Sequence, residues 1–246
     1  METGRQALLV MDVQNGIVSR YAHSQAMAPF TMAVETARQA SIPVIFVRVA
    51  FREGYPEVSP LNKSFSAITR NGGMHTADES TQIHASVAPR NGEPIVTKLR
   101  VSAFTGSDLE VILRGQGVAQ LVLCGIATSG VVLSTVREAA DKDYGLTVLS
   151  DACIDADPEV HRVLTGKVFP RQAEVVTVEE WATSLRTATV RVTIRPAALL
   201  LTSSARSLQR TTQARVNLLT RPFIPGYSPR VPHCTLCRTP AGMQRT

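Results

Sequence analysis

The sequence predicts an α/β protein whose parallel sheet is covered by helices on both faces. Apolar runs of strand length alternate along the chain with segments whose apolar residues recur at helical spacing. The runs Gln6–Asp12 and Val44–Ala50 are almost wholly apolar, as expected of strands that are buried on both faces. Right-handed crossovers between such strands place the intervening helices on both sides of the sheet.

Length and composition indicate an ordinary globular protein. The 246 residues suffice for one large α/β domain or two small ones, and 44% are hydrophobic and 19% charged. No stretch approaches the roughly 20 continuous apolar residues that cross a bilayer, and the N-terminus does not resemble a signal peptide. We therefore expect a cytoplasmic protein that has no membrane partner.

The net charge of +6 comes from the C-terminal part of the chain. From Thr187 onward there are nine Arg and no Lys, Asp or Glu, whereas residues 1–186 have 17 basic and 20 acidic residues. We therefore expect a domain over residues 1–186 and a basic, disordered extension over residues 187–246. The mildly acidic domain argues against nucleic-acid binding. For the extension two interpretations stay open: an arm that binds nucleic acid or an acidic membrane, or a segment without function, including a wrongly assigned reading frame.

The first strand ends at a carboxylate, Asp12. Burying a carboxylate is costly unless it is paired or used, so Asp12 either caps the following turn or has a function. A helix over Ala26–Ala40 and a second strand over Val44–Ala50 follow. Phe51–Gly73 is rich in Gly and Pro and is predicted to be a long loop, of the kind that often forms a lid or binding segment.

A second charged residue, Lys98, follows the short predicted strand Glu93–Thr97. Its side chain could simply extend to solvent along its apolar stem. Ser107 and Glu110 then have the spacing of a capping box, which predicts a helix over Asp108–Arg114.

The segment Leu121–Tyr144 is predicted to be a strand, a tight turn at Gly125 and a helix. In a parallel sheet, ligands bind at such a turn because the helix N-terminal amides point into the crevice there. The remaining predicted elements are strand Gly145–Ser150, a turn at Asp151–Cys153, helix Asp157–Val168, strand Ala173–Val178 and a short closing helix from Glu179.

Histidines and cysteines give weaker signals. We expect His75 and His84 to be exposed loop residues and His161 to be a structural histidine on its helix. Cys124 and Cys153 are expected to be buried thiols. Cys234 and Cys237, with His233 beside them, form half of a zinc or redox pattern, but no second pair of ligands lies nearby, so no metal is expected.

Three motifs resemble the isochorismatase-like (cysteine hydrolase) family, which includes nicotinamidases, N-carbamoyl amidases and isochorismatases. They are D-x-Q at Asp12–Gln14, K-x-x-x-S-A-F at Lys98–Phe104, and G-x-x-T-x-x-C-V, matched by Gly125–Val132. The resemblance extends over residues 6 to about 184 and has the motifs in the family's order. It implies a three-layer α/β/α sandwich with a six-stranded parallel sheet in the order 3-2-1-4-5-6.

The resemblance also implies a catalytic triad. Asp12 and Lys98 match the family's acid–base pair, but Val131 occupies the position of the nucleophilic cysteine. The amides of Ala127 and Val131 match the oxyanion hole, with a cis peptide between Ile126 and Ala127, and Thr128 and Ser129 complete the binding turn. The Asp-x-His metal site of nicotinamidases has no match in Phe51–Gly73, so the resemblance implies neither metal nor cofactor.

Three functional interpretations follow from the missing cysteine. The enzyme works without a covalent intermediate, as isochorismatases do with glycine at this position and the aspartate as general acid. Alternatively Ser129, Ser134 or Cys124 replaces the nucleophile, or the domain is a non-catalytic binding or oligomer-forming module. The presence of both Asp12 and Lys98 favours a hydrolase. We expect a small-molecule substrate and a homo-oligomer.

Overall fold

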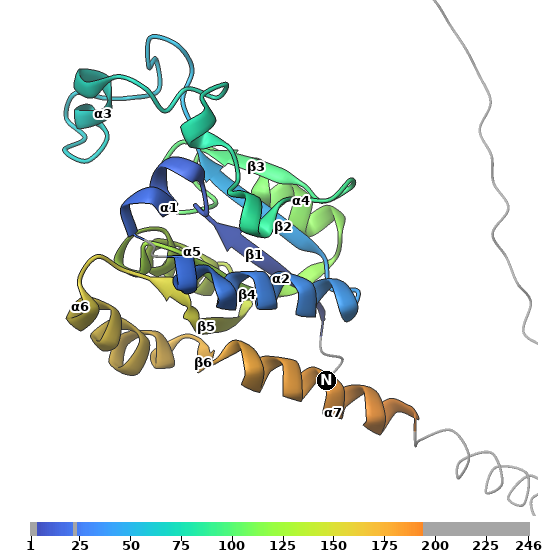
Figure 1. Cartoon of the computed structure of the whole chain (residues 1–246). Coiled ribbons are helices and arrows are strands. Elements are labelled where there is room, and N and C mark those ends of the chain that lie inside the picture. The colour runs from blue at the N-terminus through green and yellow to red at the C-terminus, as the bar shows by residue number, and fades with distance from the viewer. Residues whose placement is uncertain (1–3, 22–23, 194–246) are drawn as a thin grey trace, which may run out of the picture. The chain divides into compact units, whose positions relative to one another are not determined.

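The structure, a computed structural model, describes residues 4–21 and 24–193. Its centre is one parallel sheet in the strand order β3-β2-β1-β4-β5-β6 (Figure 1), which confirms the predicted architecture. The strands are β1 (Arg5–Met11), β2 (Val44–Val49), β3 (Ile95–Lys98), β4 (Val118–Ile126), β5 (Gly145–Ile154) and β6 (Glu174–Val176).

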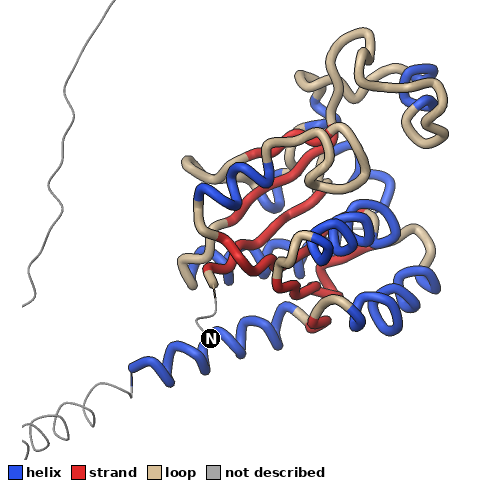
Figure 2. The backbone as a smooth tube through the Cα atoms, turned by 180° about the vertical axis from the view of Figure 1, so that it is seen from behind, coloured by secondary structure: helices blue, strands red, loops and turns tan. Residues whose placement is uncertain are grey.

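Helices cover both faces of this sheet. On one face lie α1 (Asn15–Tyr21), α2 (Ala28–Gln39) and α7 (Val178–Thr193). On the other face lie α4 (Leu109–Gly115), α5 (Leu133–Asp141) and α6 (Pro158–Val163), which continues as a π-helical turn over Leu164–Val168. Figure 2 shows α3 (Ser66–Asn71) apart from both layers, on a segment that projects from the sheet.

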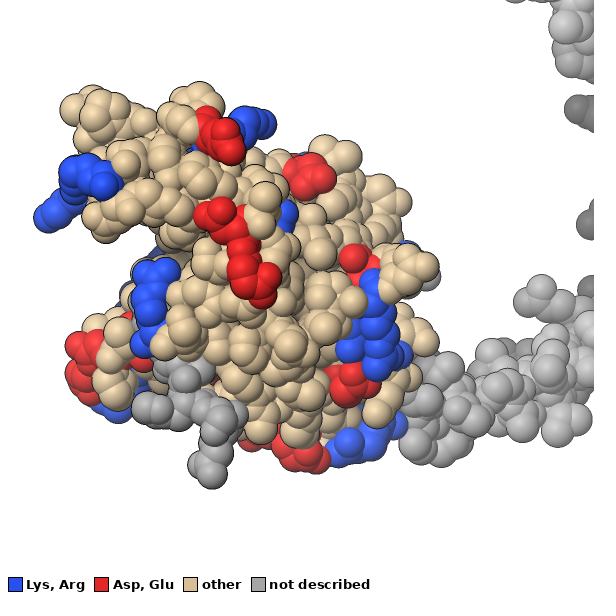
Figure 3. All heavy atoms as spheres, turned by 45° about the horizontal axis from the view of Figure 1, so that its top comes forward, with Lys and Arg blue, Asp and Glu red and all other residues tan. Residues whose placement is uncertain are grey.

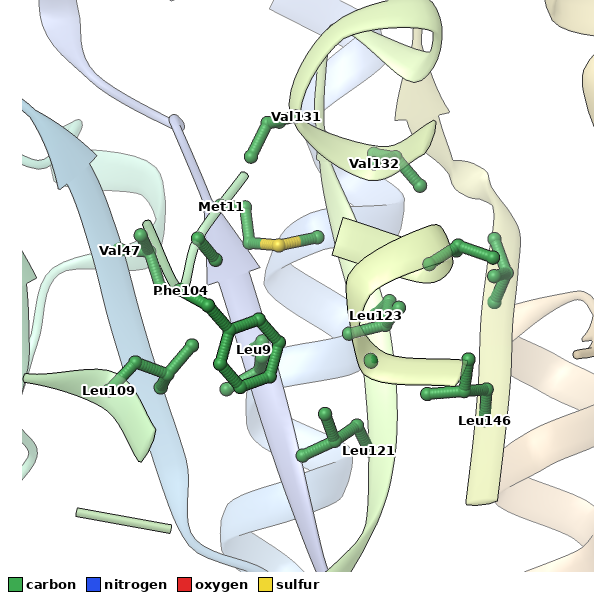
Figure 4. Close-up of a cluster of buried hydrophobic side chains, with 14 of the residues drawn as sticks. Leu9, Met11, Val47, Phe104, Leu109, Leu121, Leu123, Val131, Val132 and Leu146 are labelled. Carbon is green, nitrogen blue, oxygen red and sulfur yellow. The ribbon is translucent and has the colours of Figure 1, made fainter. Parts of the chain in front are cut away.

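Alternating side chains of β1 supply both halves of the core. Leu8 and Val10 pack with Phe30 of α2, whereas Leu9 and Met11 face the opposite side (Figure 4). Each fully buried side chain of this size contributes about 1.5–3 kcal/mol. A one-residue slip of β1 would exchange the two sets, so burial on both faces determines its register.

Strand β5 is longer than predicted. The turn expected at Asp151–Cys153 is wrong, because the strand continues to Ile154. Its pairing with β4 is irregular between Leu123 and Gly125 and then resumes, with Gly125 opposite Cys153 and Ile126 opposite Ile154. This cross-strand pairing, which the local sequence does not reveal, brings β5 to the same edge of the sheet as the end of β4.

Two local predictions also need correction. The predicted loop Phe51–Gly73 contains the short helix α3. The capping box of α4 does not form: the Ser107 hydroxyl accepts a hydrogen bond from the Leu109 amide at 3.3 Å, but the Glu110 carboxylate binds two cations, Arg114 and Lys142. A carboxylate gains more from charged donors than from a backbone amide, which explains the difference.

The closing helix α7 is not short. It runs past Arg186 to Thr193, and the chain divides into two units, Met1–Val190 and Arg191–Thr246. Residues 194–246 of the expected extension, which include Cys234 and Cys237, lie outside the described residues.

We predict that a chain ending at Thr193 keeps the thermal midpoint of the full chain. The prediction rests on the sequence, because the alternation of apolar strand and helix patterns stops before Thr193 and no Lys, Asp or Glu follows. In a domain of this size about 1 kcal/mol shifts the midpoint by roughly 2–4 °C. Differential scanning calorimetry of both chains tests this prediction. A midpoint that falls by more than about 4 °C on truncation would mean that residues 194–246 stabilise the domain.

We also predict that Gly125→Ala lowers the free energy of unfolding by about 1–3 kcal/mol. A Cβ at this position would lie 2.6 Å from the Met11 carbonyl oxygen, so β1 and β4 would have to separate. Gly115→Ala is the matched control, because nothing lies within 4 Å of its added Cβ. Urea unfolding should show the loss for Gly125→Ala only, and equal effects would contradict the close approach.

Candidate active site

The carboxyl ends of β1, β3 and β4 bring the predicted site residues to one edge of the sheet. Asp12 directly follows β1, Lys98 ends β3, and the turn Ala127–Val131 follows β4. Asp12 has a φ of 57°, in the left-handed region that non-glycine residues seldom adopt. This conformation turns the chain out of the strand at the point where the carboxylate is needed.

Asp12 and Lys98 form a buried ion pair. The Lys98 Nζ lies 2.9 Å from Asp12 Oδ2, and the two residues are 2% and 5% exposed, respectively. Lys98 therefore does not extend to solvent, and the two residues that match the family's acid–base pair are in contact. Its ammonium also donates to the carbonyl oxygens of Arg100, at 3.0 Å, and Val101, at 3.1 Å. Since an ammonium has three N–H donors, all of them are used within the protein.

Asp12 differs from Lys98 in having a free oxygen. Its Oδ1 is buried and has no hydrogen-bond partner among the described residues. Burial raises the pKa of Asp12 above its usual value of 3.8, and the attraction and hydrogen bond of Lys98 only partly counteract the increase. A protonated Asp12 could therefore present an O–H donor at Oδ1 while Oδ2 stays bound to Lys98.

Neighbouring polar residues position the pair. The buried Gln14 side chain donates to the carbonyl oxygens of Val49 and Thr81, each at 3.0 Å, and accepts from the Val49 amide at 2.8 Å. These bonds tie the chain after Asp12 to the end of β2. Sequence reasoning did not assign this role to Gln14, although the D-x-Q pattern contains it.

The residues after Lys98 explain the K-x-x-x-S-A-F pattern. Arg100 and Val101 provide carbonyl acceptors for the lysine, and the Ala103 amide donates to the buried Thr135 hydroxyl of α5 at 3.0 Å. Ala103 and Phe104 are buried in the core beneath the site. The motif therefore holds the lysine in place through the backbone that follows it.

The turn after β4 begins with the expected cis peptide between Ile126 and Ala127. Thr128–Val132 then form a π-helical turn, in which the amides of Gly130 and Val132 donate to the Ala127 carbonyl oxygen at 3.1 and 3.3 Å. Single π turns occur frequently at functional sites. The two amides that the resemblance assigns to an oxyanion, those of Ala127 and Val131, are not the ones engaged in these bonds.

Val131 is 2% exposed and belongs to the apolar cluster that contains Met11 and Phe104 (Figure 4). It packs close to the residue that precedes Asp12. Because valine has neither thiol nor hydroxyl, the turn offers no nucleophile at the position where the family has cysteine.

Two residues that sequence reasoning did not connect with the site hold this turn. The Thr128 hydroxyl lies 2.9 Å from His161 Nδ1, and the Ser129 amide donates to Asp155 Oδ2 at 2.6 Å. Burial acts to raise the pKa of Asp155, but hydrogen bonds from Ser129 and from the Asp157 and Ala156 amides outweigh it and lower that pKa. His161 lies 33 residues from Thr128, so no local pattern indicates the contact.

The cysteines of the sheet are buried, as predicted. Burial raises the pKa of Cys124 well above its usual value and that of Cys153 to about 12. Cys124 belongs to the cluster on the α2 face, whereas Val131 belongs to the opposite cluster. Neither thiol therefore has the properties of an activated nucleophile.

His75 and His84 are half-buried, so their expected exposure was wrong. His75 Nε2 lies 3.2 Å from the Tyr55 hydroxyl, and His84 Nδ1 lies 2.8 Å from that of Ser86. Within residues 4–21 and 24–193, no three His, Cys, Asp or Glu side chains gather as a metal site requires, and no helix is long and apolar enough to cross a bilayer.

Sheet order, motif positions and the Asp12–Lys98 pair together define a three-layer α/β protein with an acid–base site. The model of the isochorismatase domain family matches residues 6–180. The chain therefore belongs to the isochorismatase family.

Three similar proteins show the range of this family. The solved structure of an isochorismatase family protein from Burkholderia thailandensis is 28% identical, with a TM-score of 0.65, over 74% of this chain and 95% of that one. Ureidoacrylate amidohydrolase RutB from Pseudomonas syringae pv. syringae is 28% identical over 75% of this chain and 82% of its own length. A protein from Arabidopsis thaliana named "probable inactive nicotinamidase" is 28% identical over 73% of this chain and 95% of its own length.

We predict that Asp12→Asn changes the pH dependence of stability. Because the folded state raises the pKa of Asp12, it binds that proton more tightly than the unfolded chain does. The resulting stability is complete below pH 3.8 and is lost as the pH rises through the folded-state pKa. The free energy of unfolding of the wild type minus that of Asp12→Asn should therefore decrease with rising pH and then level off.

Urea unfolding of both proteins at a series of pH values tests this, because titrating groups that do not contact residue 12 cancel in the difference. A difference that increases with pH would mean that Lys98, and not burial, dominates the pKa of Asp12.

Proposed function

We propose that this chain is a hydrolase that uses Asp12 as a general acid on a small molecule without forming a covalent enzyme intermediate. The main support is the combination of a buried carboxyl with an apolar residue at the nucleophile's position. The pKa of this carboxyl is raised, and its Oδ1 has no hydrogen-bond partner in the described part of the chain. General acids work best when their pKa lies near the operating pH, which requires an aspartate pKa to be raised.

Lys98 has a complementary role in this proposal. When Asp12 gives its proton to the leaving group, a carboxylate forms in a buried place, and the ammonium 2.9 Å away stabilises it. Burial thus favours the protonated form of Asp12 before the reaction. Lys98 stabilises the carboxylate that remains once the proton has been transferred. Because all three Lys98 donors are engaged, the lysine positions Asp12 and does not bind the substrate.

The proposed reaction balances with water as the only other reactant. A C–N or C–O bond of the substrate breaks and the leaving atom takes the proton from Asp12. Water forms the new bond to carbon, and its released proton returns to Asp12. The amides of Ala127 and Val131 are proposed to hold the developing negative charge, with Thr128 and Ser129 forming the rest of the turn.

Replacement of the missing cysteine by another nucleophile has little support. Cys124 is buried on the opposite face with a raised pKa. The partner of Ser129 is Asp155, whose lowered pKa makes it a weak base. Ser134 lies within α5, beyond the turn.

A non-catalytic binding module is the second candidate. Val131 is packed in the apolar core, and one relative is named an inactive nicotinamidase. On this proposal the turn and Asp12 would still bind a small molecule, but no bond would break.

The expected partners and location stay predictions: a small-molecule substrate, a homo-oligomer, no nucleic acid or membrane, and a cytoplasmic location. On the face that Figure 3 presents, Lys and Arg lie among Asp and Glu. This mixture supports the expectation that the domain itself does not bind nucleic acid.

We predict that Asp12→Asn lowers kcat/KM by about 10²–10⁴ on any substrate that the wild type hydrolyses. A panel of amides, N-carbamoyl compounds and isochorismate would be assayed by product release. Asp141→Asn is the matched control, since the same change falls on an exposed residue at the end of α5. This control should keep the wild-type activity.

Two further outcomes separate the candidate functions. Activity that persists after iodoacetamide treatment supports a mechanism without a cysteine, whereas its loss would favour a thiol nucleophile. If no compound is hydrolysed but calorimetry shows specific binding that Asp12→Asn weakens, the non-catalytic module is the better account.

A further inference from the structure

The turn Ala127–Val131 contacts a segment that the proposed chemistry does not use. This segment runs from the end of β5 into α6, and two of its side chains bind consecutive residues of the turn. His161 Nδ1 lies 2.9 Å from the Thr128 hydroxyl, and Asp155 Oδ2 accepts from the Ser129 amide at 2.6 Å.

Thr128 cannot act as a surface ligand, because it is fully buried, whereas His161 is half-buried and covers it from α6. A buried hydroxyl needs a hydrogen-bond partner, and the imidazole supplies one. The bond therefore joins α6 to the first residue of the π-helical turn.

Asp155 acts at the next residue. Its Oδ2 binds the turn, while its Oδ1 accepts from the Asp157 amide at 3.3 Å, at the start of α6. The Asp157 carboxylate in turn caps α6 through the amides of Glu159 and Val160. The turn is thus bonded to a segment that has its own local hydrogen bonds.

We infer that His161 and Asp155 are positioning residues, which hold the turn so that the amides of Ala127 and Val131 point toward the reacting group. Because the Ser129 amide donates to Asp155, it is not free to bind a ligand. His161 holds the Thr128 side chain, so that its hydroxyl does not face the ligand either. The inference rests on the proposed function, because it assigns the role of a turn whose substrate is proposed.

The test uses a reporter that needs no substrate. Val131→Cys places a thiol in the turn with little change in volume, and oriented amides lower a thiol's pKa below about 8.5. Since residue 131 is buried, the thiol pKa is best measured by NMR of ¹³C-labelled cysteine, with the wild-type spectrum identifying the signals of the native cysteines.

In the Val131→Cys protein, Thr128→Val and His161→Ala should each reduce the thiolate fraction about tenfold at a given pH. The double variant should show no further reduction, because both changes remove the same bond. Thr128→Ser should retain the original value. Thr165→Val is the matched control: its hydroxyl donates to the His161 carbonyl oxygen at 2.8 Å, away from the turn, and its loss should not alter the thiol.

Asp155 is tested by comparing two substitutions. Asp155→Asn removes the charge but keeps an acceptor for the Ser129 amide, whereas Asp155→Ala removes both. A lower thiolate fraction in Asp155→Ala than in Asp155→Asn supports the positioning role, and equal fractions would show that only the charge matters.

The inference is overturned if Thr128→Val and His161→Ala leave the thiol unchanged in folded proteins, or if their effects add. Should Thr128→Val fail to fold, His161→Ala decides the question alone. Failure of the proposed function is distinguishable, because Asp12→Asn would then leave activity or binding unchanged whatever the reporter shows.

Discussion

The buried contact between Asp12 and Lys98 is the constraint on which the rest of the site depends. Transferring two charges from water into a protein core is expensive, and the attraction between them offsets this only when the remaining donors and acceptors are satisfied. Lys98 meets this condition through Asp12 and the carbonyl oxygens of Arg100 and Val101, whereas Asp12 Oδ1 has no partner among the described residues. The ends of β1 and β3 and the chain after Lys98 must therefore be placed together. The close approach of β4 to β1 at Gly125 then brings the turn Ala127–Val131 to the same edge of the sheet.

What the sequence could predict depended on short-range patterns. Apolar runs identified the strands of the sheet, and a charge at the end of such a run singled out Asp12 and Lys98, because a buried charge is costly without a purpose. Features made by distant partners were missed. The last four residues of β5 become strand only by pairing with Gly125 and Ile126, and His161 joins the site only through Thr128. The turn's cis peptide and the strand order were predicted through the family resemblance alone.

A cysteine hydrolase and the acid proposed here require opposite protonation states of the same aspartate. As a base that accepts a thiol proton, the aspartate must be ionised, so a nearby ammonium that lowers its pKa is helpful. As an acid, it must hold its proton until the substrate is in place, so the same ammonium works against it. Burial raises the pKa of Asp12 more than Lys98 lowers it. The direction of this shift is the one that the proposed acid role requires.

Val131 belongs to this balance. It lies in the same apolar cluster as Met11, the residue before Asp12, and its side chain offers no hydrogen bond and no charge. A thiolate at the same position would be a second anion at this edge of the sheet, held by the turn's amides. With valine at this position no covalent intermediate can form, and no thiol is present whose proton the aspartate could accept as a base. The substitution and the raised pKa are thus consistent with a single change of mechanism, in which the proton of Asp12 takes the place of the missing nucleophile as the reactive element.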